Sequence, residues 1–269
     1  MSAGDTQPTL PLEWTTAEEP RRRRAWPWLV AFAVVALLAA GAWFAGEAIA
    51  RDLVVKTIRS QIITNLALPA DQQIDVDVPG VIIPQLIGGS LDQVRVESQD
   101  VALGPFEGDI SVEAFDVPIR GGGELQDATA VVRVDEAQLR SLMAGVDGFP
   151  ADALGIDAPF VTASTEFDVF GAAVPVGVSL SPGATDGSLV LTPASLQVAG
   201  ADVTADELRR QFGILSNAVL RDWPVCIAQY LPAGLVLRDI TVEGDLLVAG
   251  FDIDGSIIDD PAMLENGTC

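Results

Sequence analysis

Acidic side chains are the main chemically reactive groups of this 269-residue chain, which has 38 Asp and Glu, 15 Lys and Arg, two Cys and no His. The lack of histidine excludes a Ser-His-Asp or Cys-His nucleophile, a His-ligated zinc and a histidine proton shuttle. Asp75 with Asp77, and Asp252 with Asp254, are spaced i, i+2, so each pair would lie on one strand face. Such pairs can serve a glycosidase or bind Ca²⁺, but in so acidic a chain we interpret them as solvated faces. The sequence therefore predicts a protein that is not an enzyme, with no catalytic residues, no metal site and no cofactor.

An uncharged, apolar run of 21 residues, 25–45, follows four arginines at positions 21–24. That length suits a helix that crosses a hydrocarbon layer of ~30 Å, and the arginines favour a cytoplasmic N-terminus. We expect a disordered cytoplasmic tail over residues 1–24, a transmembrane anchor or uncleaved signal over 25–46, and an extracytoplasmic (periplasmic) domain over 47–269. The protein would then be a single-pass protein of the cell membrane. A cleaved signal peptide is the alternative, because Ala48-Ile49-Ala50 has the small-x-small form of a cleavage site.

Both cysteines, Cys226 and Cys269, lie in the part that this topology exports. Disulfides form and persist in oxidising compartments, so a disulfide between them is the default expectation. A metal site needs more ligands than these two thiols, and a catalytic thiol would lack its histidine. The sequence predicts a structural disulfide.

The formal net charge of −23 repels polyphosphate, so no nucleic-acid partner is expected. A mean hydropathy of +0.36 and many aliphatic residues distinguish the chain from a disordered acidic protein and predict a buried core. Such an acidic domain is repelled by an anionic bilayer surface. Any lipid that it holds must therefore be held mainly by apolar burial.

Hydrophobic spacing divides the exported part into helices and strands. Residues 49–66 have apolar side chains at helical spacing, and helices are expected near Asp135 and Thr204, where capping-box patterns begin. From residue 74 the period changes to two, which is typical of strands with one buried face. The clearest strands are residues 75–78, 94–96, 110–112 and 132–134. The predicted fold class is α+β, with a long curved antiparallel sheet around helices, preceded by one transmembrane helix.

The inward positions of these strands and of the second helix are mostly aliphatic and contain few aromatic residues. A smooth aliphatic surface suits acyl chains, which need apolar contact without hydrogen bonds. An ordinary aliphatic core is the competing interpretation. The candidate lipid-contacting residues are Val94, Val96, Ile110, Val112, Val132, Val134, Leu208, Phe212 and Leu215.

Three passages occur in order after the single apolar run: residues 87–96 (IGGSLDQVRV), 191–200 (LTPASLQVAG) and 230–235 (YLPAGL). Together they resemble the actinobacterial LmeA-like phospholipid-binding family, over about residues 47–255. The resemblance implies a tubular lipid-binding fold, similar to the domains of the bactericidal permeability-increasing protein, in which a bent sheet encloses an apolar tunnel. It also implies a cell-envelope role on phospholipid or phosphatidylinositol-derived glycolipid, such as support of mannan elongation on lipomannan. No catalytic residue is transferred from the family.

The headgroup of such a lipid would carry phosphate, which arginine binds by bidentate hydrogen bonds. Arg95 and Arg133 are the headgroup candidates, although surface arginines more often pair with acids. The alternative function is a non-enzymatic envelope adaptor that binds a protein partner, not identified by the sequence, through its acidic surface. The adaptor model predicts a filled core, whereas the lipid model predicts an apolar cavity and a bound phospholipid.

Overall fold

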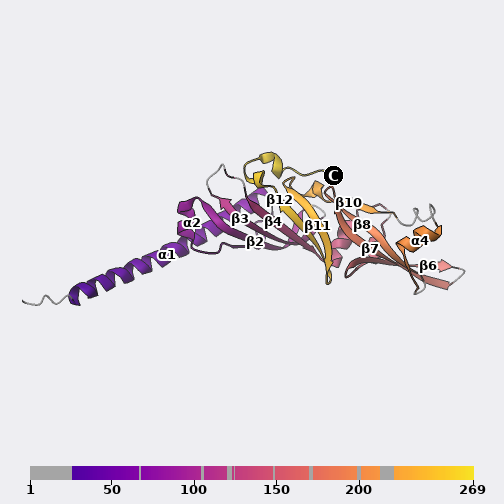
Figure 1. Cartoon of the computed structure of the whole chain (residues 1–269), viewed down its shortest axis with the longest axis horizontal. Helices are drawn as coiled ribbons and strands as arrows, with labels where there is room; N and C mark the ends of the chain where they lie inside the picture. The colour runs from indigo at the N-terminus through magenta and orange to yellow at the C-terminus, as the bar shows by residue number, and fades with distance from the viewer. Residues whose placement is uncertain are drawn as a thin grey trace, which may run out of the picture. The chain divides into compact units, whose positions relative to one another are not determined.

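The computed structural model describes residues 26–66, 68–103, 106–119, 123, 125–147, 149–169, 172–198, 201–212 and 221–269 (Figure 1). The predicted tail, residues 1–24, lies outside them. The chain divides into two units, Met1–Ala45 and Gly46–Cys269.

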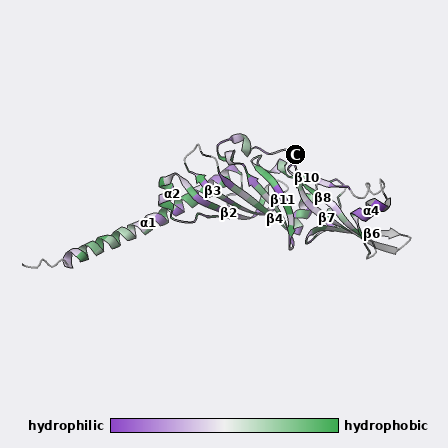
Figure 2. Cartoon of the chain, viewed as in Figure 1, coloured by the Kyte–Doolittle hydropathy of each residue, from purple (hydrophilic) through white to green (hydrophobic). Residues whose placement is uncertain are grey.

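Helix α1 (Trp26–Asn65) is 40 residues long. Its early part is long and apolar enough to cross a membrane (Figure 2). Every residue of this part, from 26 to 45, is exposed. From Gly46 onward the helix belongs to the second unit. The sequence predicted a span followed by a separate amphipathic helix. The two form one helix because residues 45–50 contain no proline and only one glycine.

The first sheet of the second unit, sheet A, has six antiparallel strands in the order β1-β2-β3-β4-β12-β11 (Figure 1). Its strands are β1 (Ile74–Asp77), β2 (Ser90–Leu103), β3 (Phe106–Pro118), β4 (Asp127–Val134), β11 (Leu235–Glu243) and β12 (Leu246–Ile253). Helix α2 (Ile82–Gly88) connects β1 with β2. It ends at Gly89, whose left-handed φ of 92° allows its N–H to bond to the Gln85 carbonyl.

The second sheet, sheet B, runs β10-β8-β7-β6-β5, and β9 also pairs with β8. Its strands are β5 (Leu154–Asp157), β6 (Phe160–Val169), β7 (Ala172–Thr185), β8 (Ser188–Val198), β9 (Ala201–Thr204) and β10 (Trp223–Cys226). Asp186 and Gly187 both have positive φ in the two-residue turn between β7 and β8, as a type I′ hairpin requires.

Two helices and four short 3₁₀ helices complete the described part of the second unit. Helix α3 (Glu136–Met143) begins with the predicted capping box. The Asp135 carboxylate accepts from the Gln138 N–H, and the Gln138 side-chain oxygen accepts from the Asp135 N–H. Helix α4 (Ala205–Phe212) is capped by Thr204, whose hydroxyl accepts from the Glu207 N–H. The 3₁₀ helices are Ala151–Ala153, Ala228–Tyr230, Gly255–Ile258 and Pro261–Leu264.

Two clusters of buried aliphatic residues form the core. The larger cluster joins sheet A, sheet B and α3, and includes Val132, Leu139, Leu191 and Phe251. The smaller cluster, called the helix cluster below, joins β1, α2 and β2 with the second half of α1. Ile110 of β3 packs against both clusters, so the two cores are contiguous.

The large antiparallel sheets and few helices confirm the predicted α+β class. The sequence predicted one long sheet, whereas the strands are divided between two. The strands divide in this way because β12 pairs with β4, far from it in sequence. This pairing places the hairpin of β11 and β12 in sheet A, although β10, which precedes it in the chain, belongs to sheet B.

Candidate functional site

One face of sheet A, called the inner face below, is lined with aliphatic side chains. Residues directly opposite each other in antiparallel strands point to the same side of the sheet. The register of four strand pairs therefore places a row of residues on the inner face, through the pairs Val76↔Val96, Val96↔Val112, Val112↔Ala130 and Ala130↔Phe251. The row crosses the sheet from β1 to β12.

The second half of α1 covers the β1 to β3 side of the inner face. Its apolar residues pack on the helix cluster, whose buried members include Ile74, Val76 and Val94. The packed helix residues are Ala50, Val54, Val55, Ile58, Ile62, Ile63 and Leu66. This set contains Val55, Ile58, Ile62 and Leu66, the apolar residues at helical spacing within residues 49–66, so this amphipathic period positions the helix against the sheet.

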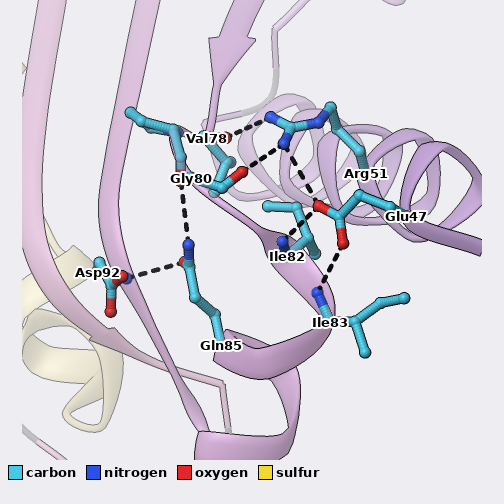
Figure 3. A network of polar contacts seen from close by, with 9 residues as sticks. Glu47, Arg51, Val78, Gly80, Ile82, Ile83, Gln85 and Asp92 are labelled. Atoms are coloured by element: carbon cyan, nitrogen blue, oxygen red, sulfur yellow. Dashed lines mark hydrogen bonds and ion pairs between the residues drawn. The ribbon is translucent and has the colours of Figure 1, made fainter. Parts of the chain in front are cut away.

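A polar network around Glu47 fixes α1 at the start of the second unit (Figure 3). The Glu47 carboxylate accepts hydrogen bonds from the N–H groups of Ile82, at 2.5 Å, and Ile83, at 3.1 Å. These are the first two residues of α2, whose N-terminal N–H groups have no partner within their own helix. The residue before them, Val81, provides no side-chain cap. Glu47 therefore caps α2 from a different helix.

Arg51 and Gln85 extend this network to the loop before α2 (Figure 3). The Arg51 guanidinium donates to the carbonyls of Val78 and Gly80, both at 2.6 Å, and lies 3.4 Å from the Glu47 carboxylate. Gln85 donates to the Pro79 carbonyl at 3.0 Å. The hydrogen bond from the Ile82 N–H, more than any other contact, lowers the pKa of Glu47 below its ordinary value of 4.5. The hydrogen bonds of the folded structure therefore favour the charged form of the Glu47 carboxylate.

An apolar cavity of about 200 Å³ lies between the last turns of α1 and the inner face. Eight of its nine lining residues are aliphatic, and the ninth is the half-buried Ser98. The lining residues are Ile62, Leu66, Leu68, Ile74, Val96, Ser98, Val101, Ile110 and Val112. Drug-sized ligands occupy pockets of ~300–1,000 Å³, so this cavity accommodates part of an apolar chain and not a whole lipid.

The structure brings three of the predicted lipid-contacting residues together, because Val96, Ile110 and Val112 line the cavity. Val94 is buried in the helix cluster on the same face. Val132 and Val134 are buried in the larger core cluster, away from the cavity lining. Leu215 and the side chains of Leu208 and Phe212 lie outside the described part of the chain.

The predicted headgroup residues lie on the other face of sheet A. Arg95 is paired in register with Glu113 and forms an ion pair with it at 3.0 Å. Arg133 donates to the Ser111 hydroxyl at 3.2 Å. Both arginines follow inward-facing valines by one residue, so strand alternation turns them away from the cavity.

The acid pairs have structural surroundings that differ from one another. Asp75 and Asp77 are exposed on β1. Asp252 forms an ion pair with Arg238 at 3.0 Å, and Asp254 accepts from the Ser256 hydroxyl and N–H. The Ser256 hydroxyl is the main cause that lowers the pKa of Asp254. Among the described residues, no three His, Cys, Asp or Glu side chains are grouped as metal ligands.

Six cavity residues were not among the lipid candidates from the sequence: Ile62, Leu66, Leu68, Ile74, Ser98 and Val101. Ile74 is the first residue of β1 and directly precedes the first predicted strand, residues 75–78, and its inward direction follows from the alternation there. Val101 departs from simple alternation because β2 has a register shift between Ser98 and Val101. Such a bulge leaves no clear signal in the sequence.

A helix packed on the aliphatic face of a large antiparallel sheet, with an apolar cavity between them, defines a protein suited to bind an apolar chain. The chain belongs to the LmeA-like phospholipid-binding family, whose family model matches residues 41–251. This match confirms the resemblance seen in the sequence and assigns lipid binding to the chain. Searches of curated proteins and of solved structures found no significant match.

Proposed function

We propose that this protein is anchored in the membrane by the first part of α1 and binds a phospholipid in its extracytoplasmic domain, with part of an acyl chain in the cavity between α1 and sheet A. The observation that carries the proposal is the cavity lining, which is aliphatic except for Ser98. An acyl chain has no hydrogen-bonding groups, so it matches a surface that presents almost none.

The Glu47 network supports retention of the apolar segment as an anchor. Cleavage after Ala50 would remove the carboxylate that caps α2, together with Gly46, which lies against Ile83. The domain would lose contacts that position α1 on the inner face. A signal peptide that is discarded has no need to contribute such contacts to the mature fold.

The finer role that we propose is a non-enzymatic one in the cell envelope: the protein holds phospholipid or phosphatidylinositol-derived glycolipid during lipoglycan (mannan) biogenesis. Membership of a phospholipid-binding family supports the lipid ligand. The headgroup roles of Arg95 and Arg133, and the lipid contacts of Val94, Val132, Val134, Leu208, Phe212 and Leu215, remain part of this proposal.

Native mass spectrometry of the full chain, released from detergent micelles, tests the proposal. We expect a phospholipid adduct in a stoichiometric amount, identified after solvent extraction. A folded, oxidised protein that carries no lipid and takes up none from added vesicles would contradict the proposal. That result would favour the adaptor, which binds a protein through its acidic surface.

A further inference from the structure

We propose that the outer side of α2 lies in the surface of the lipid bilayer, so that the domain docks on the membrane through a patch of apolar side chains. This inference rests on the membrane anchoring in the proposed function and adds a second contact with the bilayer. The patch, called the α2 patch below, consists of Val81, Pro84, Ile87 and Ile119, which are all exposed.

Helix α2 exposes apolar residues where a surface helix of a soluble domain exposes polar ones. Its single polar side chain, Gln85, is instead the one buried polar residue in the described part of the chain. Gln85 is fully engaged there, since it donates to the Pro79 carbonyl and accepts from the Asp92 N–H, both at 3.0 Å. Ile87, in contrast, is 73% exposed, and Val81, just before the helix, is 48% exposed. The outer side of α2 is therefore apolar.

The segment around α2 carries no charge of its own. Residues 78–91 contain no Asp, Glu, Lys or Arg, although the whole chain has a net charge of −23. Glu47 and Arg51, which contact this segment, are engaged with each other and with its backbone groups. An anionic bilayer surface repels the acidic domain as a whole, but it has no free charge to repel in this segment.

Ile119 extends the patch from the end of β3. It is 43% exposed, and its N–H donates to the carbonyl of Gly89, the residue after α2, at 3.0 Å. The exposed apolar side chains thus come from two parts of the chain that the fold joins. Apolar side chains gathered in this way mark a surface that another apolar phase covers.

The place of α2 in the chain indicates that this phase is the bilayer. The apolar segment ends at Ala45, and the second unit begins with Gly46, which lies against Ile83 of α2. Glu47, the next residue, accepts from the first two N–H groups of α2 (Figure 3). The headgroup layer beside the hydrocarbon is ~5–8 Å thick, so a bilayer that holds the apolar segment reaches the residues around Gly46. Apolar side chains at that level are stabilised by entering the interface.

The test uses the full chain in phosphatidylcholine vesicles, with a fluorescent probe on one introduced cysteine. The two native cysteines are joined in a disulfide, so the probe reacts with the introduced thiol alone. Ile87→Cys places the probe in the α2 patch. Asp245→Cys is the control: it is also exposed, and it lies in the turn between β11 and β12, at the edge of sheet A opposite to β1.

Lipids that carry a nitroxide near the start of one acyl chain quench a probe that lies in the bilayer surface. We expect them to quench about half or more of the fluorescence at position 87, because an interfacial helix buries its apolar face ~5–10 Å deep. The probe at position 245 should instead be quenched by iodide in the water. High salt should leave the quenching at position 87 unchanged, because the contact is apolar.

A second set of variants tests whether apolar burial drives the docking. The probe is moved to Val81→Cys, and Ile87→Asp or Ile87→Leu is added. Ile87→Asp should lower the nitroxide quenching at position 81 to the level at position 245, because a carboxylate resists transfer out of water. Ile87→Leu should leave the quenching unchanged. Both changes affect an exposed side chain, so the variants should fold.

Strong quenching of the probe at position 87 by iodide, in protein that stays in the vesicles, would overturn the inference, because the patch would then lie in water. Protection from both quenchers would also overturn it, because a second copy of the chain would then cover the patch. Protein that an alkaline wash removes from the vesicles would contradict the anchoring in the proposed function, so the two failures are distinguishable.

Discussion

Val112 and Val131 lie on the neighbouring strands β3 and β4 but on opposite faces of sheet A. Val112 lines the apolar cavity, whereas Val131 is half-buried on the other face. The two valines have the same side chain and similar backbone surroundings. They therefore allow a matched test of whether the cavity is the lipid site.

Val112→Phe should reduce bound phospholipid roughly tenfold, because the larger side chain would occupy part of the cavity and burying about two fewer CH₂ groups of the acyl chain costs roughly 1.5 kcal/mol. Val131→Phe is the control and should bind as the wild type does. Bound lipid is measured by mass spectrometry after extraction from equal amounts of folded protein. Unchanged binding in Val112→Phe would show that the cavity is not the lipid site.

The Glu47 carboxylate gives a second prediction for a single residue. Its lowered pKa means that it stabilises the fold fully above its ordinary value of 4.5, and this stabilisation is lost as the pH falls through the lower pKa of the folded protein. The midpoint of thermal unfolding should fall more steeply below pH 4.5 in the wild type than in Glu47→Gln.

Asp52→Asn is the control for this prediction. Asp52 lies on the same helix but is exposed, and its ion pair among the described residues is with Lys56 at 2.7 Å. Its variant should follow the wild-type pH dependence. Parallel curves for the wild type and Glu47→Gln would show that the carboxylate does not need its charge to cap α2.

At the scale of helices and strands, the sequence predicted the features that depend on residues close together in the chain. The capping box at Asp135 and the alternating residues of β1 and β4 are readable because each depends on neighbours in the chain. Helix α2 was not predicted, because its N-terminus is capped by a carboxylate 35 residues away. The separation into two sheets was likewise not readable, since it depends on the long-range pairing of β4 with β12.

The candidate site was predicted in part for the same reason. Alternation gave the direction of Val96, Ile110 and Val112 correctly, and all three reach the cavity. Alternation could not show that Val132 and Val134 lie in the filled core cluster that joins the two sheets. The open space depends on where α1 ends and where the β2 bulge falls, which are properties of the assembled domain.

The disulfide between Cys226 and Cys269 joins β10 to the segment that follows β12, as the sequence predicted. That segment also bonds to the chain before β11, through the Ala233 N–H to the Glu265 carbonyl and the Gly267 N–H to the Leu231 carbonyl. The cysteines are 43 residues apart in sequence. The covalent link therefore closes a long loop that contains two strands of sheet A.

Replacing both cysteines by serine should lower the free energy of unfolding by roughly 4 kcal/mol, the value for closure of a loop of this length. Chemical denaturation of the variant and of the oxidised wild type measures the difference. The reduced wild type is the control and should resemble the variant. Equal stability of the oxidised and reduced wild type would mean that the non-covalent contacts alone hold the segment.

For the whole molecule, the apolar segment and the start of the second unit belong to one helix, since α1 runs from Trp26 to Asn65. We expect protein purified from membranes to keep its apolar segment, because the domain uses Glu47. Intact mass and N-terminal peptide mapping check this expectation. A mature chain that begins at Arg51 would show that the signal is cleaved and that α2 holds its place without the carboxylate.

The most direct test of the central claim is photo-crosslinking of the full chain with a phospholipid that carries a diazirine near the end of one acyl chain. The account predicts that crosslinks map to the two sides of the cavity, at Ile62 and Leu66 of α1 and at Val96, Ile110 and Val112 of sheet A. Crosslinks confined to the other face of sheet A, around Val131, would contradict it.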